Sequence, residues 1–507
     1  MKVHLMYPDR DFDLNQTLPP NAQELIDDLA LTPLFDAMAQ RDEFLFNSAR
    51  TAILCGISDP GTIVYRQDVL KVFLRSPELA REMYELASET LEARRKNYLG
   101  IFTKNPSGVI YQSVRLLQLL MEALHKLRSI ADQNRNRVES AGLTALFDMV
   151  QVELSDDYLE RVRAHLKRFD IDNGMLLRVQ LGPGNRGTHY TLVQDENRGP
   201  NWLGLVLGRR RGYTFHLSAR DEAGHRVLAE MKDRGTNQAA NALAQSADHI
   251  LSFFHQLKAE VAFFVGCLNV SDGLVRIGAP TCFPTPLDAR ERHWYAQGIY
   301  DICLCLNTQQ QVVGNDLSAD GKDLWVVTGA NQGGKSTFLR SVGITQLMMQ
   351  SGMFVPARSL TANTVEAVFT HFRKEEDAEM NQGKFDEELS RMSHIVDQIS
   401  PEALLLCNES FAATNEREGS EVARQIIEAL VEHSVQVVFV THLYAFAGKL
   451  YGEQREDTLF LRAMRTEEGK RTFRIEPGRP LSTSFGRDLY EEVFEQATTA
   501  ALEGKQG

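Results

Sequence analysis

Closely spaced glycines precede a lysine and two hydroxyl residues in the segment Gly329-Ala330-Asn331-Gln332-Gly333-Gly334-Lys335-Ser336-Thr337. The spacing fits G-x-x-x-x-G-K-[ST], the pattern of a loop that binds nucleotide phosphates. Glycines let backbone N–H groups turn towards phosphate oxygens without a Cβ clash, and the lysine adds a positive charge for the β and γ phosphates. The hydroxyl of Ser336 would ligate Mg²⁺. We therefore expect this whole segment to bind a nucleoside triphosphate.

The residues on either side of this loop predict the elements that would position it. Residues 323–327 form an apolar run, Asp-Leu-Trp-Val-Val, which is typical of a buried strand. Residues 336–349 favour a helix, whose N-terminal dipole would face the phosphates. An incidental glycine-rich turn needs neither a strand before it nor a helix after it. The strand, loop and helix together therefore predict a nucleotide site.

A second polar pair, Asn408 and Glu409, follows the apolar run of residues 403–407. Phosphate-loop enzymes with an Asp-Glu pair here use the aspartate to hold the metal's water shell and the glutamate to polarise the attacking water. The amide oxygen of Asn408 can still orient a metal-bound water, but it brings no negative charge. We expect Ser336 and Asn408 at the metal and Glu409 at the water. The alternative is that Glu409 is a solvated glutamate at the end of a strand.

A histidine follows the next apolar run. Residues 435–440 predict another buried strand, and Thr441-His442 comes directly after it. A histidine at that strand end can reach the γ-phosphate and report whether it is present. Taken alone, such a histidine is more often structural. Together with the other motifs, the pattern makes His442 the third candidate catalytic residue, beside Lys335 and Glu409.

Length and composition bound the class of protein. With 507 residues and 43% hydrophobic content, the chain can bury two or three cores. Its first residues lack the apolar core of a secretory signal and no apolar run approaches the length of a membrane span. We therefore expect a cytoplasmic protein without membrane contact. The six cysteines are scattered, which favours buried thiols over zinc ligands or disulfides.

The net charge of −13 argues against a protein that coats nucleic acid generally. A local basic face on an acidic protein would still bind a phosphate backbone. Charge therefore neither establishes nor excludes DNA as a partner.

The texture of the sequence changes twice along the chain. Residues 21–171 show helical periodicity, residues 174–232 contain short β-favouring runs typical of a hairpin insertion, and residues 237–267 are again helical. A Pro-rich connection at residues 278–286 follows. Strand and helix then alternate from about 299 to 494, which indicates a mostly parallel sheet with helices on its faces. We expect a mainly helical domain over residues 1–286 with a hairpin at about 174–232, and an α/β phosphate-loop domain over residues 287–507.

These motifs in this order, with Asn315-Asp316 ahead of the first strand, resemble the ABC-type ATPase domain of the MutS family of DNA mismatch repair and its relatives. The similar segments are residues 313–317, 328–337, 353–357, 368–370, 405–419, 440–442 and 484–486. Upstream, residues 59–68 are similar to the start of the family's helical core. The likeness thus covers most of the chain, and the ATPase motifs are highly specific.

The resemblance implies a mechanism. Two subunits of a homodimer would sandwich two ATP molecules, and hydrolysis with Mg²⁺ would change the angle of helical levers that grip DNA. Val312, Val313 and Asn315 would flank the adenine, and His442 would sense the γ-phosphate. Because ligands would come from both chains, the dimer is expected to close only with ATP bound.

Two alternatives keep the same ATPase fold. The first is an ATP-gated scaffold whose helical half binds another protein. The second is the soluble motor of an ABC transporter, but the transporter signature motif is missing and the helical half has no use there.

The sequence also departs from the family. Where the family has an S-T-F-x-x-E signature, residues 383–388 read Gly-Lys-Phe-Asp-Glu-Glu, so the serine is missing. Lys384 or the backbone N–H of Gly383 could take its place, or the segment is simply a polar helix start. Together with Asn408, this change predicts slow hydrolysis.

The family's amino-terminal mismatch-reading domain has no counterpart in the sequence, and a smaller hairpin stands in place of its clamp domain. Base-mismatch recognition is therefore not expected. The basic residues best suited to contact a phosphate backbone are Arg209, Arg210, Arg211, Arg94 and Arg95. They could equally be solvated residues that balance an acidic protein.

Overall fold

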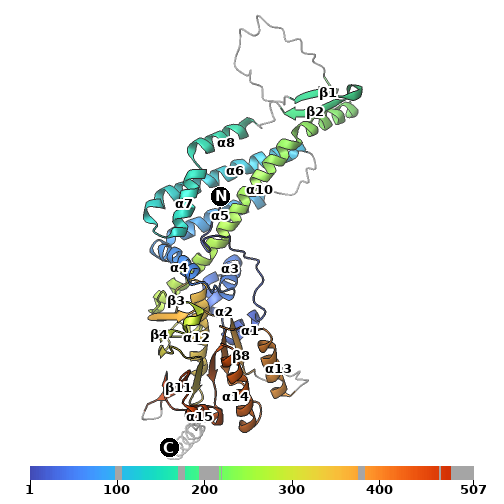
Figure 1. Cartoon of the computed structure of the whole chain (residues 1–507). Coiled ribbons are helices and arrows are strands. Elements are labelled where there is room, and N and C mark those ends of the chain that lie inside the picture. Colours follow the sequence, from blue (N-terminus) through green and yellow to red (C-terminus); the bar gives the residue numbers. More distant parts are fainter. Residues whose placement is uncertain are drawn as a thin grey trace, which may run out of the picture. The chain divides into compact units, whose positions relative to one another are not determined.

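The computed structural model describes residues 1–97, 106–168, 177–192, 216–218, 220–374, 383–466 and 470–480 (Figure 1). The chain divides into two compact units, which we call the helical unit and the sheet unit. The helical unit comprises Met1–Val3, Glu78–Val138 and Leu143–Lys258. The sheet unit comprises His4–Pro77, Glu139–Gly142 and Ala259–Gly507.

Long helices make up most of the helical unit. They are α5 (Pro77–Asn97), α6 (Pro106–Asn134), α7 (Ala141–Glu153), α8 (Asp156–Arg168) and the first part of α10 (Glu222–Ile277). On α6 the apolar residues recur every three or four positions, and Leu117, Leu120, Leu124 and Leu127 are all buried. This is the pattern of a helix with one face in a core. The helical character predicted for this part of the chain is confirmed.

A short hairpin lies within the predicted insertion. Strand β1 (Leu177–Leu181) pairs antiparallel with β2 (Gly187–Leu192). Residues 193–215 fall outside the described residues. The far end of the segment differs from the sequence-based expectation, because α10 already begins at Glu222, within the range expected to contain β-favouring runs.

Helix α10 also corrects the expectation that no apolar run is long enough to cross a membrane. Among the described residues it is the one helix that is long and apolar enough to cross a membrane, by length and composition alone. Its most apolar stretch is 72% buried inside the protein. A buried core helix of a soluble protein has the same length and composition, so the absence of membrane contact stays a prediction.

A six-stranded sheet forms the centre of the sheet unit, in the order β12-β11-β6-β10-β9-β8. Its strands are β6 (Leu324–Thr328), β8 (Val368–Phe372), β9 (Leu404–Asn408), β10 (Gln436–Val440), β11 (Thr458–Arg465) and β12 (Arg471–Pro477). All neighbouring pairs are parallel except β11 with β12. Strands β6, β8 and β10 are buried at every position, as expected for parallel strands that helices cover on both faces.

Helices cover this sheet. They include α1 (Ala22–Asp28), α12 (Lys335–Gln350), α13 (Lys384–Val396), α14 (Glu416–Glu432) and α15 (Tyr444–Glu453). One core contains Met392 of α13, Ile427 of α14 and Phe446 of α15, together with apolar strand residues such as Leu405 and Val437. Helix α13 lies beside β8 (Figure 1). The predicted combination of helices with mostly parallel strands is confirmed.

A second sheet of four strands, in the order β3-β7-β4-β5, was not predicted. Its strands are β3 (Thr285–Leu287), β4 (Trp294–Ile299), β5 (Asn315–Ser318) and β7 (Ser359–Asn363). The short helix α11 (Ile302–Thr308) follows β4 and begins at the cap residue Asp301, whose carboxylate accepts from the backbone N–H of Leu304 at 2.9 Å. This sheet places residues 312–315, which precede or start β5, near the phosphate loop.

The sheet unit also contains residues from the beginning of the chain. Helices α2 (Thr32–Ala39), α3 (Glu43–Leu54) and α4 (Pro60–Arg75) belong to it. The two compact units therefore do not meet at the domain boundary expected near residue 286. That the α/β domain begins near this residue stays a prediction.

A buried carboxylate fixes the first residues of the sheet unit. The side chain of Glu260 is fully buried and accepts from the backbone N–H groups of Leu5, Met6 and Phe12 at 2.5, 3.0 and 3.2 Å. The equally buried guanidinium of Arg66 donates from Nε to the carbonyl of Met6 at 2.9 Å. A buried charge is tolerated when hydrogen bonds satisfy it, so this segment is part of the core.

Candidate nucleotide site

The predicted loop joins β6 to α12 and has the backbone of a phosphate-binding loop. Gly329 has φ of 123° and Gly334 has φ of 92°, values that side-chain-bearing residues rarely adopt. A Cβ at Gly329 would also lie 2.9 Å from Cβ of Ala463 on β11. Both glycines are therefore required by the geometry, and Gly334 caps the N-terminus of α12.

Lys335 points into the loop. Its Nζ donates to the carbonyl oxygens of Gly329 at 2.9 Å and Ala330 at 3.0 Å, and the residue is 4% exposed. Burial lowers the pKa of this ammonium group, while the nearby charge of Glu409 raises it. An ammonium group has three N–H bonds, so one remains for an anion in the cavity.

Ser336 and Asn408, the two predicted metal ligands, contact each other. Ser336 Oγ donates to Asn408 Oδ1 at 2.8 Å. Both are oxygen ligands of the kind that Mg²⁺ takes, but both are neutral. No group of three or more His, Cys, Asp or Glu side chains suited to a metal occurs in the part of the chain that the structure describes. The pair fits a magnesium ion that is held largely by substrate phosphates and water.

Glu409 follows β9 directly and lines the same cavity. Its φ is 54°, and its backbone N–H donates to the carbonyl of Val440 at 2.9 Å. His442, by contrast, is exposed and is not among the residues that line the cavity. The structure thus brings Lys335, Ser336 and Glu409 together but does not bring His442 to them, and its sensor role stays a prediction.

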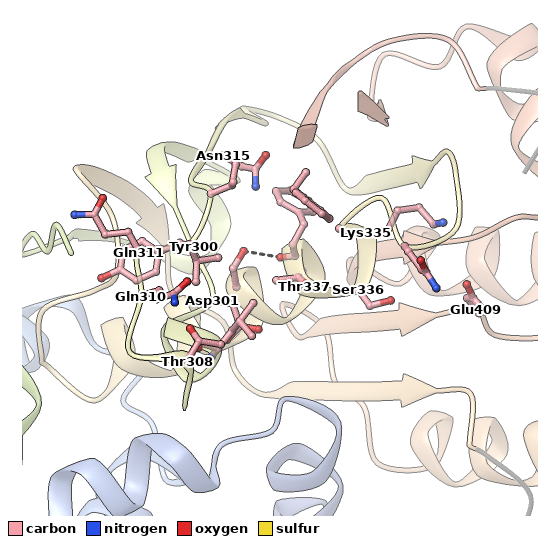
Figure 2. A pocket seen from close by; sticks show the side chains of 18 residues that line it. Tyr300, Asp301, Thr308, Gln310, Gln311, Asn315, Lys335, Ser336, Thr337 and Glu409 are labelled. Carbon is pink, nitrogen blue, oxygen red and sulfur yellow. Dashed lines mark hydrogen bonds between the residues drawn. The ribbon is translucent and has the colours of Figure 1, made fainter. Parts of the chain in front are cut away.

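A cavity of about 440 Å³ extends from the phosphate loop, which is within the usual range for small-molecule sites. Figure 2 shows Lys335, Ser336 and Glu409 at one end and Gln310 and Gln311 at the other. The further predicted residues that line it are Val312, Val313, Asn315, Gln332, Gly334 and Thr337. Gly329, Ala330 and Gly333 are buried behind this surface and Asn331 is exposed.

Several lining residues had no sequence signal. They are Tyr300, Asp301, Leu304, Thr308, Gln310, Gln311, Phe338, Ser341 and Phe473. Asp301 is 1% exposed, and its second carboxylate oxygen accepts from Arg340 Nε at 2.9 Å. This ion pair with the partly exposed Arg340 and the cap of α11 give Asp301 a structural role.

Phe473 reaches the cavity from β12, far along the chain. It is 47% exposed, and its φ of 57° places it in the left-handed region. Next to it, the backbone N–H of Ile475 donates to Asn315 Oδ1 at 2.7 Å. Strand β12 is therefore tied to the segment that carries Val312 and Val313. An aromatic ring and two valines would suit a flat, apolar ligand group such as a nucleobase.

The altered signature segment begins a helix. Gly383 is the N-cap of α13, and Asp386 and Glu387 lie in its first turn. Gly383 and Lys384 are exposed. The carboxylates suit the positive end of the helix dipole, as the polar-helix alternative requires.

The basic candidates lie elsewhere. In the helical unit, Arg94 is 4.0 Å from the carboxylate of Asp248, and Arg95 is exposed. Arg209, Arg210 and Arg211 lie outside the described residues, as does the segment 484–486.

Comparison with protein families matches two parts of the chain. Residues 58–277 match the MutS2 N-terminal domain, and residues 325–486 match MutS domain V. The second match contains the phosphate loop, the end of β9 and Thr441-His442.

Individual relatives match shorter stretches. The chain is 36% identical over 219 residues to "Endonuclease MutS2" of Lacticaseibacillus casei, covering 43% of this chain and 27% of the relative. It is 32% identical over 137 residues to "DNA mismatch repair protein MutS" of Chloroflexus aurantiacus, covering 26% and 14%. It is 28% identical over 146 residues to "MutS protein homolog 4" of Mus musculus, covering 29% and 15%. The matches thus span less than a third of each of these relatives.

Proposed function

The chain belongs to the MutS family, and we propose that it binds and hydrolyses ATP in the cavity between the phosphate loop and the end of β9. The observation that carries this proposal is the hydrogen bond from Ser336 to Asn408, with Glu409 beside it. Lys335, Ser336 and Glu409 line this cavity, and Asn408 contacts Ser336 from the end of β9. This arrangement supports a phosphoryl-transfer site of the phosphate-loop class.

Binding uses the loop and the far end of the cavity. Backbone N–H groups at the start of α12 and the ammonium of Lys335 bind the triphosphate. The hydroxyl of Ser336 and the amide oxygen of Asn408 would hold Mg²⁺, which supplies positive charge to the phosphate oxygens. Val312, Val313 and Phe473 enclose the adenine.

Hydrolysis depends on Glu409. Its carboxylate lines the cavity at the end of β9. There it accepts a hydrogen bond from a water molecule and orients that water towards the γ-phosphate. Because Asn408 brings no charge and the signature serine is replaced, turnover is slow. His442 senses the γ-phosphate only if the turn after β10 rearranges, since its side chain lies outside the cavity.

The wider function follows the family. We infer a homodimer that closes on ATP and acts on DNA, with Arg94, Arg95 and Arg209 to Arg211 at the phosphate backbone. The acidic balance of the chain, −13, favours one alternative, an ATP-gated scaffold that binds a protein. Retention on immobilised DNA separates the two, because phosphate contacts release counterions and weaken steeply as salt rises. Absence of salt-sensitive retention favours the scaffold.

Steady-state ATPase rates test the site itself. Lys335→Ala should lose nucleotide binding, and Glu409→Gln should bind ATP but lose hydrolysis by about a hundredfold or more. Lys449→Ala, an exposed lysine on α15, is the matched control and should behave as wild type. If wild type, Lys335→Ala and Glu409→Gln hydrolyse ATP at the same rate, the site assignment is wrong. A slow wild type alone is compatible with Asn408.

A further inference from the structure

A buried polar cluster lies directly beside Glu409. It consists of His371 on β8, Ser410 in the loop after β9, and Glu388 on α13, and we call it the His371 cluster. His371 and Ser410 are fully buried and Glu388 is 4% exposed. His371 Nδ1 lies 2.7 Å from Ser410 Oγ, and His371 Nε2 lies 3.0 Å from the carbonyl of Glu388. Three elements that are distant in sequence thus meet at one imidazole ring.

The backbone on both sides of Ser410 is in an uncommon conformation. Glu409 has φ of 54° and Phe411 has φ of 63°, which non-glycine residues adopt only where surrounding contacts hold them. The Phe411 ring stacks on His371 with centroids 5.6 Å apart and an interplanar angle of 22°. Ser410 Oγ also lies 2.7 Å from the carbonyl of His371. Contacts to His371 therefore hold the loop immediately after Glu409.

Glu388 ties α13 to the same loop. Burial raises the pKa of its carboxyl group, while hydrogen bonds from the backbone N–H groups of Ala413 and Phe411 lower it. Its Oε2 has no hydrogen-bond partner among the described residues. Helix α13 is thus joined to residues 410–413 twice, through the carboxylate of Glu388 and through its carbonyl and His371.

The protons on the His371 ring and on the Ser410 hydroxyl determine which hydrogen bonds the cluster can make. Nε2 faces a carbonyl oxygen, so it must carry a proton. Burial and then the charge of Arg391 lower the pKa of His371 to about 4, so Nδ1 is an acceptor at neutral pH. Both Nδ1 and the carbonyl of His371 lie within reach of Ser410 Oγ, which has a single proton. The Ser410 hydroxyl therefore has two competing acceptors on one residue.

We propose that His371 and Ser410 are positioning residues for Glu409, and that Glu388 makes the position of this loop depend on helix α13. The inference rests on the proposed ATPase function and deepens it. A shift of α13 moves the carbonyl and carboxylate of Glu388, and the loop responds through His371. Glu409 then gains or loses its alignment with the attacking water, while the phosphate loop continues to bind the nucleotide.

Single-atom changes separate positioning from binding. In Ser410→Ala the hydroxyl is lost with little change in volume. We expect kcat to fall about tenfold from misplacement of Glu409, with KM and the affinity for a fluorescent ATP analogue within about twofold of wild type, since no phosphate-binding residue changes. Ser420→Ala is the matched control, because Ser420 is a buried serine on α14 whose hydroxyl has no partner among the described residues. It should match wild type in all three quantities.

Two replacements of His371 test the direction of the coupling. The amide of His371→Asn lies near the position of Nδ1 and can keep the contact to Ser410, whereas that of His371→Gln lies nearer Nε2 and keeps the contact to Glu388. We expect His371→Asn to retain more of kcat than His371→Gln. A residue that serves only packing would give equal losses.

Hydrogen–deuterium exchange of the full chain gives a readout that does not need hydrolysis. We expect Ser410→Ala and His371→Gln, but not Ser420→Ala, to speed exchange in residues 409–413. Unchanged kcat and unchanged exchange in both variants would overturn the inference. If wild type binds no ATP, the proposed function fails, and exchange alone decides whether the cluster holds the loop. If His371→Gln does not fold, Ser410→Ala still decides.

Discussion

The hydroxyl of Ser336 at the start of α12 donates to the side-chain oxygen of Asn408 at the end of β9, with 2.8 Å between the two oxygens. In the family motif that this segment resembles, the position of Asn408 is occupied by a carboxylate. Here the contact joins two neutral groups, and the nearest carboxylate on the strand end is Glu409. The charge at residue 408 is therefore the simplest property of the site to change.

Asn408→Asp should strengthen magnesium binding. A carboxylate at residue 408 adds one negative charge beside the metal, which we expect to lower the Mg²⁺ concentration for half-maximal ATP turnover on the order of tenfold. This is measured by following nucleotide affinity and ATP turnover as the Mg²⁺ concentration is raised. Asn237→Asp is the control, since Asn237 is an exposed residue on α10 and is not among the residues that line the cavity. A Mg²⁺ requirement equal to that of wild type would show that residue 408 does not meet the metal.

Phe473→Ala should weaken nucleotide binding without slowing the chemical step. Loss of one aromatic stacking partner costs about 0.5–1.5 kcal/mol, so the Kd for ATP should rise by roughly two- to tenfold, while kcat stays close to wild type. Equilibrium titration with a fluorescent analogue and initial-rate kinetics report the two quantities. Tyr451→Ala removes an aromatic ring of similar exposure, 39% against 47%, outside the cavity and should leave Kd unchanged.

The stability of the sheet unit should fall in acid because of His371. Its pKa is lowered from 6.5 to about 4 by burial and by Arg391, so the unfolded chain binds a proton that the folded chain does not. The favourable contribution is complete above pH 6.5 and is lost as the pH falls towards 4, up to ~3 kcal/mol. Urea unfolding followed by fluorescence of the buried pair Trp294 and Trp325 measures it.

The comparison variant for acid stability is His371→Asn, which cannot titrate in this range. Its urea midpoint should change less than that of wild type between pH 7 and pH 5. His433→Asn, which replaces an exposed histidine on the same unit, should follow wild type. Parallel pH dependence in wild type and His371→Asn would rule out His371 as the source.

Association should depend on nucleotide. The variant Glu409→Gln is suited to this test, because it should bind ATP but hydrolyse it very slowly. If ligands from two chains complete the ATP site, the molecular mass of this variant in solution should double when ATP and Mg²⁺ are added. Lys335→Ala should stay monomeric under the same conditions. A monomer at all nucleotide concentrations would contradict the homodimer that closes on ATP.

The parts of the site that lie close together in sequence could be predicted from it. The phosphate loop and the strand end at Asn408 are local patterns, each set by a run of apolar residues followed by a few polar ones. Phe473 could not be found this way, because an antiparallel pairing between β11 and β12 brings it to the cavity. His371 carries no motif either, since its partners come from α13 and from the loop after β9.

The same limit applies to the fold. Alternating strands and helices predicted a mostly parallel sheet, because each such element has its own periodicity. The second sheet pairs residues 285–287 with 361–363, and short strands that pair so far apart give no periodic signal. His442 follows a correctly placed strand, but the direction of its side chain depends on the turn that follows, which apolar periodicity does not encode.

The buried carboxylate of Glu260 has a practical consequence for making the protein. Deleting the first dozen residues would remove from this buried acid the N–H donors of Leu5, Met6 and Phe12, at a cost of roughly 1–3 kcal/mol or more. Shortened expression clones and affinity tags at the N-terminus should therefore preserve residues 5–12, which contact Glu260. Otherwise, insoluble material could be mistaken for failure of the ATP site.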